Sequence, residues 1–243
     1  DLPDNGEVPI YPMTAIDEIT ARTPDALFNG TAVAEIIKSC VPNIKDPWSV
    51  SNVDLDPILV AIKTATNGSE MDVDSTCPKC DEDGKYGVNL SGVLASFKPG
   101  DYSKALALND DVQIKFKPLS FKLINESSIQ QFQLQKFMQN MLTIEDDDER
   151  TQKGKELLLE LNKIATGLIA ESIEYIKIPS ATVMEKEFIL EYLQNCDSKT
   201  YDAIKAYNIQ LKESTESKPL EMKCVSCGHE YKQTFSINVS DFR

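Results

Sequence analysis

Two pairs of cysteines are the part of the 243-residue sequence most able to do chemistry. Cys77 and Cys80 lie in the segment C-P-K-C, and Cys224 and Cys227 lie in C-V-S-C-G-H. The C-x₂-C spacing lets two thiolates on one tight turn reach the same cation, and two such turns supply the four sulfur ligands of a closed structural zinc site. The sequence therefore predicts one structural Zn²⁺ per chain, bound by all four cysteines.

Other roles for these cysteines are less consistent with their surroundings. A redox-active C-x₂-C usually begins a helix that follows a strand, and neither pair does. An iron–sulfur cluster remains possible with four cysteine ligands, although flanking glycines and strands favour zinc. The six cysteines of the chain could also form three disulfides. Because the sequence begins without the basic and apolar segments of a signal peptide, reduced thiols and a metal are the preferred interpretation.

The remaining histidine and cysteines are not expected to bind the metal. His229 is the only histidine and lies two residues after Cys227. As a ligand it would compete with Cys227 for one coordination position, so we expect it beside the site or exposed. Cys40 and Cys196 fall on apolar helix faces and are predicted to be core residues.

No catalytic motif was found in the sequence. It contains no Walker loop, no G-x-G-x-x-G, no H-E-x-x-H and no G-x-S-x-G. The acidic pair Asp54 and Asp56 is explained by helix capping, and the run Glu145–Glu149 by a solvated turn or helix start. The sequence thus predicts a protein that is not an enzyme. A metalloenzyme stays an alternative that would require an open coordination position on the metal.

The charge of the chain restricts its partners. It has 25 basic and 39 acidic residues, a net charge of −14 and a pI near 4.6. Nucleic-acid binding depends on Lys/Arg surfaces that neutralise phosphates, and the sequence shows no such cluster. Anionic membranes are disfavoured for the same reason, and no apolar run reaches the ~20 residues of a spanning helix. Basic protein partners are compatible with this charge.

Hydrophobic periodicity predicts helices around β segments. Residues 1–12 are expected to form an extended arm. The predicted helices cover residues 14–22, 24–29, 31–40, 54–67, 125–142, 151–177, 182–195 and 198–213. The predicted strands flank both cysteine pairs, at residues 86–90, 112–117, 220–222 and 231–239.

These elements predict an α+β fold that is mainly helical. Residues 1–72 are expected to form the N-terminal arm and a helical unit. Residues 73–124 together with 219–243 are expected to form a discontinuous zinc-ribbon domain with short antiparallel strands. Residues 125–218 would then be a long helical insertion between the two halves of the ribbon.

The sequence around residues 10–80 resembles a known family. The similarity lies in the run P-M-T-A-I-D-E-I-T-A-R-T-P-D-A-L-F-N-G-T, then K-S-C-V-P, then D-L-D-P-I-L-V-A-I-K-T-A-T-N-G, and finally C-P-K-C. The residues that carry it are Thr23, Pro24, Asp25, Ala26, Leu27, Asn29, Gly30, Ser39, Cys40, Val41, Pro42, Asp54, Asp56, Ile62, Ala65, Thr66 and Gly68. On these residues the chain resembles the baseplate hub and hub-assembly family of T4-like bacteriophages.

The resemblance implies a non-enzymatic role in building the central hub of a contractile-tail baseplate. The implied partners are other tail and baseplate hub proteins, with the tape-measure protein among the candidates. The implied location is the cytoplasm of the infected host during assembly, and then the tail baseplate of the virion if the protein is retained. The alternative from another class is a zinc-ribbon accessory factor in nucleic-acid processing, which a Lys/Arg-rich ribbon surface would favour.

Overall fold

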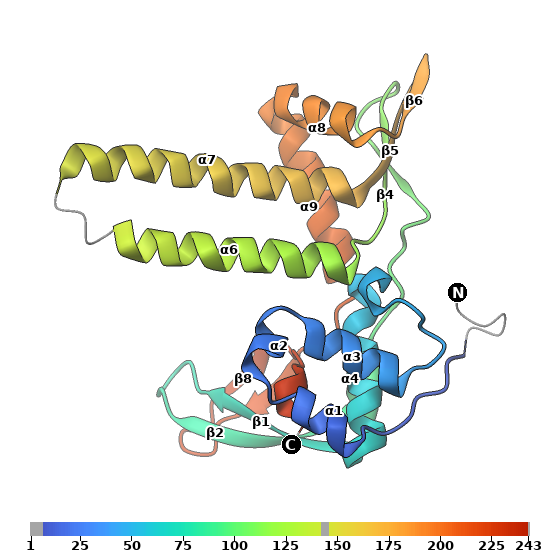
Figure 1. Ribbon diagram of the computed structural model, residues 1–243, viewed down its shortest axis with the longest axis vertical. Helices are drawn as coiled ribbons and strands as arrows, with labels where there is room; N and C mark the ends of the chain where they lie inside the picture. The colour runs from blue at the N-terminus through green and yellow to red at the C-terminus, as the bar shows by residue number, and fades with distance from the viewer. Residues whose placement is uncertain (1–6, 142–145, 243) are drawn as a thin grey trace. The chain divides into compact units, whose positions relative to one another are not determined.

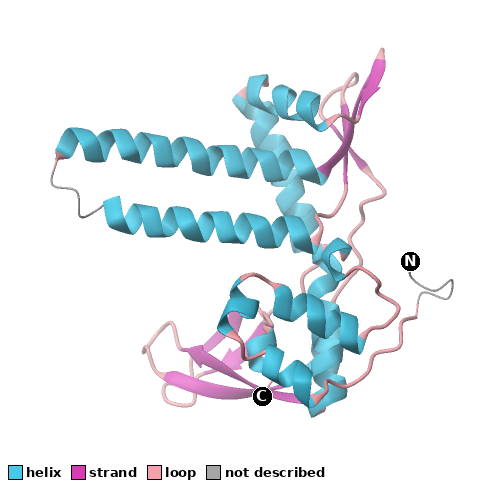
Figure 2. Ribbon diagram, in the orientation of Figure 1, coloured by secondary structure: helices cyan, strands magenta, loops and turns pink. Residues whose placement is uncertain are grey.

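A computed structural model describes residues 7–141 and 146–242. The chain forms two compact units, of which unit 2 comprises Gly100–Ser214 and unit 1 comprises the described residues before and after it. Helices account for most of the regular structure, and all sheets are antiparallel (Figures 1 and 2). The predicted α+β class with mainly helical content is therefore confirmed. Of the predicted N-terminal arm, residues 1–6 lie outside the described residues.

The N-terminal part of unit 1 is helical, as the sequence predicts. Its helices are α1 (Ala15–Thr20), α2 (Pro24–Phe28), α3 (Thr31–Cys40), the 3₁₀ helix η1 (Pro47–Ser49) and α4 (Asn52–Asn67). Helix α5 (Leu90–Ser96), which follows strand β2 (Asp83–Asn89), was not predicted. The capping box expected at Thr14 is present at the start of α1. The carboxylate of Asp17 in this box also accepts a hydrogen bond from the Ser39 hydroxyl at 2.9 Å, which ties α1 to α3.

Unit 1 has one hydrophobic core that joins distant parts of the sequence. Ile36 and Ile37 of α3 and Ile62 of α4 are fully buried in it. Phe235 and Ile237, from the last segment of unit 1, are buried in the same cluster. The buried residues of α3 thus share one core with residues some 200 positions later in the chain.

Two hairpins carry the cysteines. The first hairpin consists of β1 (Glu70–Thr76) and β2 (Asp83–Asn89), and the second of β7 (Leu220–Lys223) and β8 (Glu230–Gln233). The sequence predicts the other three strands but no strand at the position of β1. The sequence did not indicate this strand because only two apolar residues, Met71 and Val73, alternate with its exposed carboxylates.

The chain after β8 is extended but belongs to no sheet. The predicted strand 231–239 is paired with β7 only as far as Gln233. Beyond it Phe235, Ile237 and Val239 still alternate between buried positions and exposed neighbours, so the periodicity was interpreted correctly while the strand pairing was not. The 3₁₀ helix η2 (Val239–Asp241) follows, and the buried Lys63 ammonium donates to the Asp241 carbonyl at 2.9 Å.

Unit 2 combines a four-stranded sheet with four helices among its described residues. The sheet has the order β3 (Ala105–Ala107), β4 (Gln113–Phe116), β5 (Ile173–Ile178) and β6 (Ala181–Val183). The helices are α6 (Phe121–Met141), α7 (Asp147–Ser172), α8 (Lys186–Asn195) and α9 (Ser198–Glu213). Phe116, Ile114 and Ile173 of the sheet and Ile189 and Ile204 of α8 and α9 form its core.

Two sequence-based boundaries in unit 2 are wrong. The helix predicted for 151–177 ends at Ser172, and its last residues form strand β5. The helix predicted for 182–195 begins only at Lys186, because Ala181–Val183 pairs with β5 as strand β6. The first error arises because the β-branched residues of β5 follow the helical pattern of α7 without a break, and the pairing partner β4 lies about 60 residues earlier in the chain.

The Lys186 side chain binds the backbone where helix α7 changes into strand β5. Its ammonium donates to the carbonyl oxygens of Ala170 at 2.9 Å and Glu171 at 3.2 Å, and also to that of Ile173. These oxygens lie at the C-terminal end of α7, where a positive charge is favourable and carbonyls lack helical partners. Lys186 thereby stabilises the sharp change from helix α7 to strand β5.

The compact units group the residues differently from the expected domain segments 1–72, 73–124 with 219–243, and 125–218. The predicted strand 112–117 was assigned to the ribbon, whereas β4 lies in unit 2 and pairs with β5. The N-terminal helices and the cysteine hairpins were separated in the prediction, whereas one core contains both. Hydrophobic patterns show that a strand is buried but not which unit buries it.

Candidate metal centre

Each cysteine pair lies in the turn of its hairpin, and the two turns have the same backbone geometry. In the first, the Cys77 amide donates to the Glu82 carbonyl and the Asp81 amide donates to the Cys77 carbonyl, both at 2.9 Å. In the second, Cys224 makes the same two bonds with His229 and Gly228, also at 2.9 Å. The fourth residue after the first cysteine has a positive φ in both turns, 56° at Asp81 and 70° at Gly228.

The structure brings all four predicted ligands together. The sulfur of Cys77 lies 3.7 Å from that of Cys227, and the sulfur of Cys80 lies 3.6 Å from that of Cys224. All four sulfurs lie within 4.8 Å of one another. Four thiolates around one ion with Zn–S bonds of about 2.3 Å would be about 3.8 Å apart, so the spacing fits a single tetrahedral ion. The four cysteines can therefore hold a metal ion without rearrangement.

The four sulfurs differ in exposure. The first cysteine of each pair, Cys77 or Cys224, is buried, and the second, Cys80 or Cys227, is exposed. The amide of Cys227 donates toward the Cys224 sulfur and, against the opposing effect of burial, lowers the pKa of this thiol to about 7. Backbone amides that stabilise a thiolate in this way also stabilise it as a metal ligand.

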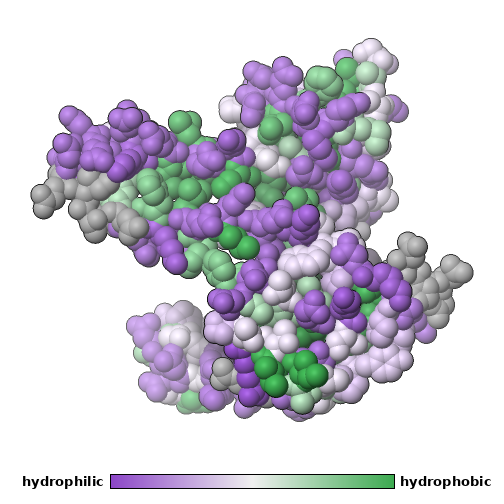
Figure 3. Space-filling view, viewed as in Figure 1, coloured by the Kyte–Doolittle hydropathy of each residue, from purple (hydrophilic) through white to green (hydrophobic). Residues whose placement is uncertain are grey.

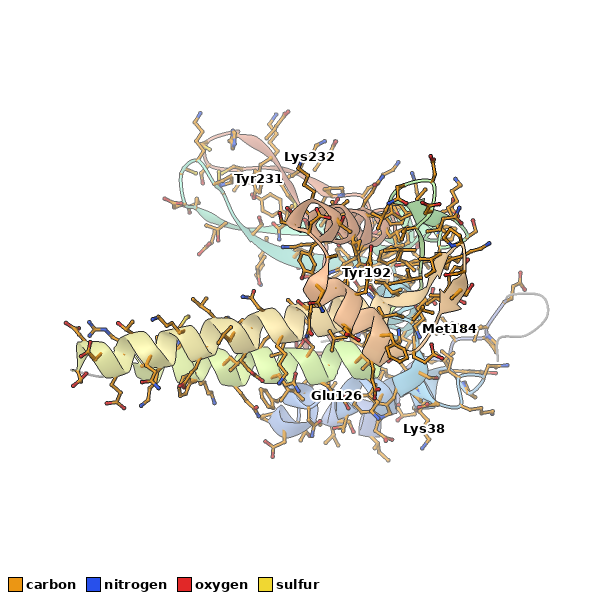
Figure 4. The ribbon with its side chains drawn as sticks, turned by 90° about the horizontal axis from the view of Figure 1, so that it is seen from above. Lys38, Glu126, Met184, Tyr192, Tyr231 and Lys232 are labelled. Atoms are coloured by element: carbon orange, nitrogen blue, oxygen red, sulfur yellow. The ribbon has the colours of Figure 1, made fainter. Side chains whose placement is uncertain are left out.

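Hydrogen bonds between hydroxyl groups join the two hairpins that carry the cysteines. The Tyr231 hydroxyl of β8 shares a hydrogen bond with the Ser75 hydroxyl of β1 at 2.8 Å and lies 3.4 Å from the Tyr86 hydroxyl of β2. Tyr231 and its neighbour Lys232 point to opposite faces of β8, with Tyr231 toward the first hairpin (Figure 4). These positions were not predicted as site residues, because hydroxyl partners 156 residues apart leave no local signal.

The other predicted residues lie outside the sulfur cluster. His229 does not belong to it; the His229 ring is half-buried and stacks on Tyr231 with the ring centroids 6.2 Å apart. Cys40 is fully buried, as predicted, and burial together with the charge of Asp17 raises the pKa of this thiol to about 11. Cys196 is only half-buried, at the C-terminal end of α8.

The alternative acidic sites are explained by local structure. Asp54 is in the first turn of α4, whose N-cap is Ser51 rather than Asp54 itself. Asp146 caps α7 by accepting a hydrogen bond from the Glu149 amide, which agrees with the helix start expected there. Glu145 lies outside the described residues.

The whole sequence was compared with models of protein families. Residues 1–242 match the family described as the T4 bacteriophage base plate protein. The chain belongs to this family. The resemblance noted over residues 10–80 is thereby confirmed and extends to the rest of this base plate protein. Neither the curated proteins nor the solved structures contain a match to it.

None of the helices in the described residues is both long and apolar enough to cross a bilayer. The space-filling view shows hydrophilic and hydrophobic side chains interspersed over one face of each unit (Figure 3).

The two turns allow a test of backbone strain in this base plate protein. Changing Gly228 to Ala is expected to lower the free energy of unfolding by about 1 kcal/mol, because the substituted residue must keep a positive φ. Changing Asp81 to Gly is expected to raise it by a few tenths of a kcal/mol, up to about 1 kcal/mol, by relieving the same strain in the first turn.

Chemical denaturation of the two variants measures both effects. A Cβ added at Gly228 would meet no atom within 4 Å, so packing does not complicate the comparison. Gly87 of β2, which also has open space around it but no positive φ, provides the control as Gly87→Ala. Equal effects of Gly228→Ala and Gly87→Ala would contradict the strain argument.

Proposed function

We propose that this protein is a hub or hub-assembly component of the phage baseplate, which acts through protein–protein contacts without catalysing a reaction. The observation that carries the proposal is the family match over residues 1–242. A baseplate protein must recognise other baseplate proteins, and the tape-measure protein is a further candidate partner. On this proposal the protein meets its partners in the host cytoplasm and then lies in the tail of the virion if it is retained.

We also propose that the four cysteines hold one structural zinc ion per chain. The spacing of their sulfurs fits a single ion, whereas a cluster that distributes its cysteine ligands over several iron atoms needs wider spacing. Four protein ligands leave no open position for a substrate, so such an ion would stabilise the two hairpins rather than activate water. The ion would connect segments that lie 144 residues apart in sequence.

The surface charge of the hairpins argues against the nucleic-acid alternative. Residues 70–89 and 218–233 contain five lysines and eight carboxylates. The alternative required a ribbon surface rich in Lys and Arg, because phosphate neutralisation supplies most of the non-specific affinity for nucleic acids. An excess of carboxylates on these hairpins would instead repel a phosphate backbone.

A pull-down from cells that also express the neighbouring tail proteins tests the functional proposal. We expect the tagged protein to recover at least one baseplate hub protein after nuclease treatment. Recovery of nucleic acid without any tail protein would overturn the proposal in favour of an accessory factor. Mass spectrometry of purified virions, performed in parallel, distinguishes a retained hub subunit from a factor that leaves after assembly.

A further inference from the structure

A groove of about 920 Å³ lies on the surface of unit 1 between two extended stretches of backbone. One side of the groove is strand β1 from Glu70 to Asp74, and the other is the chain from Gln233 to Ser236. Lys63 and Asn67 of helix α4, Lys85 of β2, and Ser240 and Asp241 also line it. The groove is separate from the sulfur cluster, because none of the four cysteines lines it.

Both sides of the groove have backbone groups available for pairing. β1 is paired with β2 alone, so its other edge has no strand partner in the described structure. Residues 234–237 are extended, yet across the described chain their amides and carbonyls make no hydrogen bond to another backbone group. Unpaired extended backbone beside a groove is the arrangement to which a further strand can be added.

The side chains of β1 show which strand would fit. Glu70, Asp72 and Asp74 are exposed on one face of β1, and Met71 and Val73 are half-buried on the other. Asp72 is opposite Gly87 of β2, which provides no opposing charge, and Asp74 is opposite Lys85. Oppositely charged residues on neighbouring strands stabilise each other when they share a face. A strand with basic residues at every second position would place them beside these carboxylates.

The positive groups around the groove do not cancel its acidic character. The Lys63 side chain is buried and its ammonium is bound to the Asp241 carbonyl. Lys85, which also lines the groove, is opposite Asp74 in the register of the hairpin. The side-chain amide of Asn89 donates a hydrogen bond to Glu70 at 2.8 Å, whereas Asp72 is opposite the uncharged Gly87.

We propose that this groove binds an extended segment of a protein partner in which basic and apolar residues alternate. The backbone of the segment pairs with residues 234–237, its basic side chains lie beside Asp72 and Asp74, and its apolar side chains lie over the half-buried residues of β1. The inference deepens the proposed function and rests on it in one respect, that the partner is a protein.

The experiment uses the full-length metal-loaded protein and a fluorescein-labelled heptapeptide, Gly-Lys-Val-Lys-Val-Lys-Gly. An isomer of the same composition, Gly-Lys-Lys-Lys-Val-Val-Gly, has equal charge but cannot place its lysines on one face of a strand. Fluorescence anisotropy is expected to show tighter binding of the alternating peptide. The double variant D72N/D74N removes two exposed charge pairs between the peptide and the groove. It is therefore expected to weaken that binding by about tenfold.

The matched control is E216Q/E221Q, which removes two exposed carboxylates outside the groove and should change the affinity less than about twofold. Hydrogen exchange of the amides of residues 234–237 is expected to slow when the alternating peptide is added. Equal binding of the two isomers, unchanged binding by D72N/D74N, or unprotected amides at 234–237 would each overturn the proposal.

The pull-down separates this proposal from the proposed function. The groove would be supported as a docking site if the wild type and E216Q/E221Q recover tail proteins that D72N/D74N does not recover. Equal recovery by all three proteins would remove the groove as an interface and leave the baseplate function intact.

Discussion

Replacing Cys224 with Ser is expected to abolish stoichiometric zinc and to lower the free energy of unfolding of unit 1 by about 5 kcal/mol or more. Structural zinc contributes about 10–16 kcal/mol of binding free energy in zinc-finger peptides, and on the proposed zinc site part of that energy would be folding energy of unit 1. Cys224 is buried, so its loss also leaves three thiolates around an incomplete site. Elemental analysis and thermal unfolding of the purified variant measure the two effects.

Cys196→Ser is the matched control for this prediction. Cys196 is half-buried in unit 2 and does not belong to the sulfur cluster. We expect this variant to keep about one zinc per chain, the stoichiometry of a Cys₄ site. Metal-free wild-type protein after careful purification, or a Cys224→Ser variant with full zinc content, would contradict the assignment of the four cysteines. Iron in place of zinc would change the metal but keep the ligands.

The second large effect is expected in the core of unit 2. Phe116→Ala should lower the free energy of unfolding of this unit by about 3–5 kcal/mol, the usual cost of truncating a buried aromatic residue. Phe116 is 1% exposed on strand β4, and its ring lies 5.4 Å from that of Tyr207 on α9. The substitution therefore removes the contact between the sheet and a helix that covers it.

Hydrogen exchange measured by mass spectrometry resolves this effect by region. Exchange should increase in the strands and helices of unit 2, while the zinc content stays the same, because the hydrophobic core of unit 1 contains none of these residues. Phe188→Ala on α8, where Phe188 is 58% exposed, is the control and should be close to neutral. A Phe116→Ala variant that loses its metal would show that the two cores are energetically coupled.

The cluster of four cysteines was predictable from the sequence because its spacing is local within each pair. Two residues between cysteines fix a turn, and a second such turn suggests the same ion. The sequence could not show that Asp81 has the left-handed conformation that Gly228 has in the other turn. An aspartate tolerates that conformation better than most residues, so only the comparison of the two turns makes it visible.

The helices of unit 1 were predictable for a similar reason. A capping box at Thr14 and the apolar spacing of Ile36, Ile37 and Cys40 act over a few residues, and the structure contains both. Strand β5 was missed because its residues continue the apolar pattern of α7. What makes it a strand is β4, whose residue Ile114 pairs with Ile176 from far along the chain. Partners at such separations override local preference and leave no local trace.

Unit 1 is built from two stretches of sequence that unit 2 separates, and this order has a consequence for synthesis on the ribosome. Translation produces all of unit 2 before it produces the second cysteine turn or Phe235 and Ile237. Unit 2 has its own core and can fold as it emerges, since domains generally fold as units during synthesis. Unit 1 cannot close its core, or offer four thiolates to a metal, until residues 224–239 have been made. Metal uptake would therefore mark chains that have been translated past this point, and a nascent chain stopped earlier would expose the apolar faces of α3 and α4.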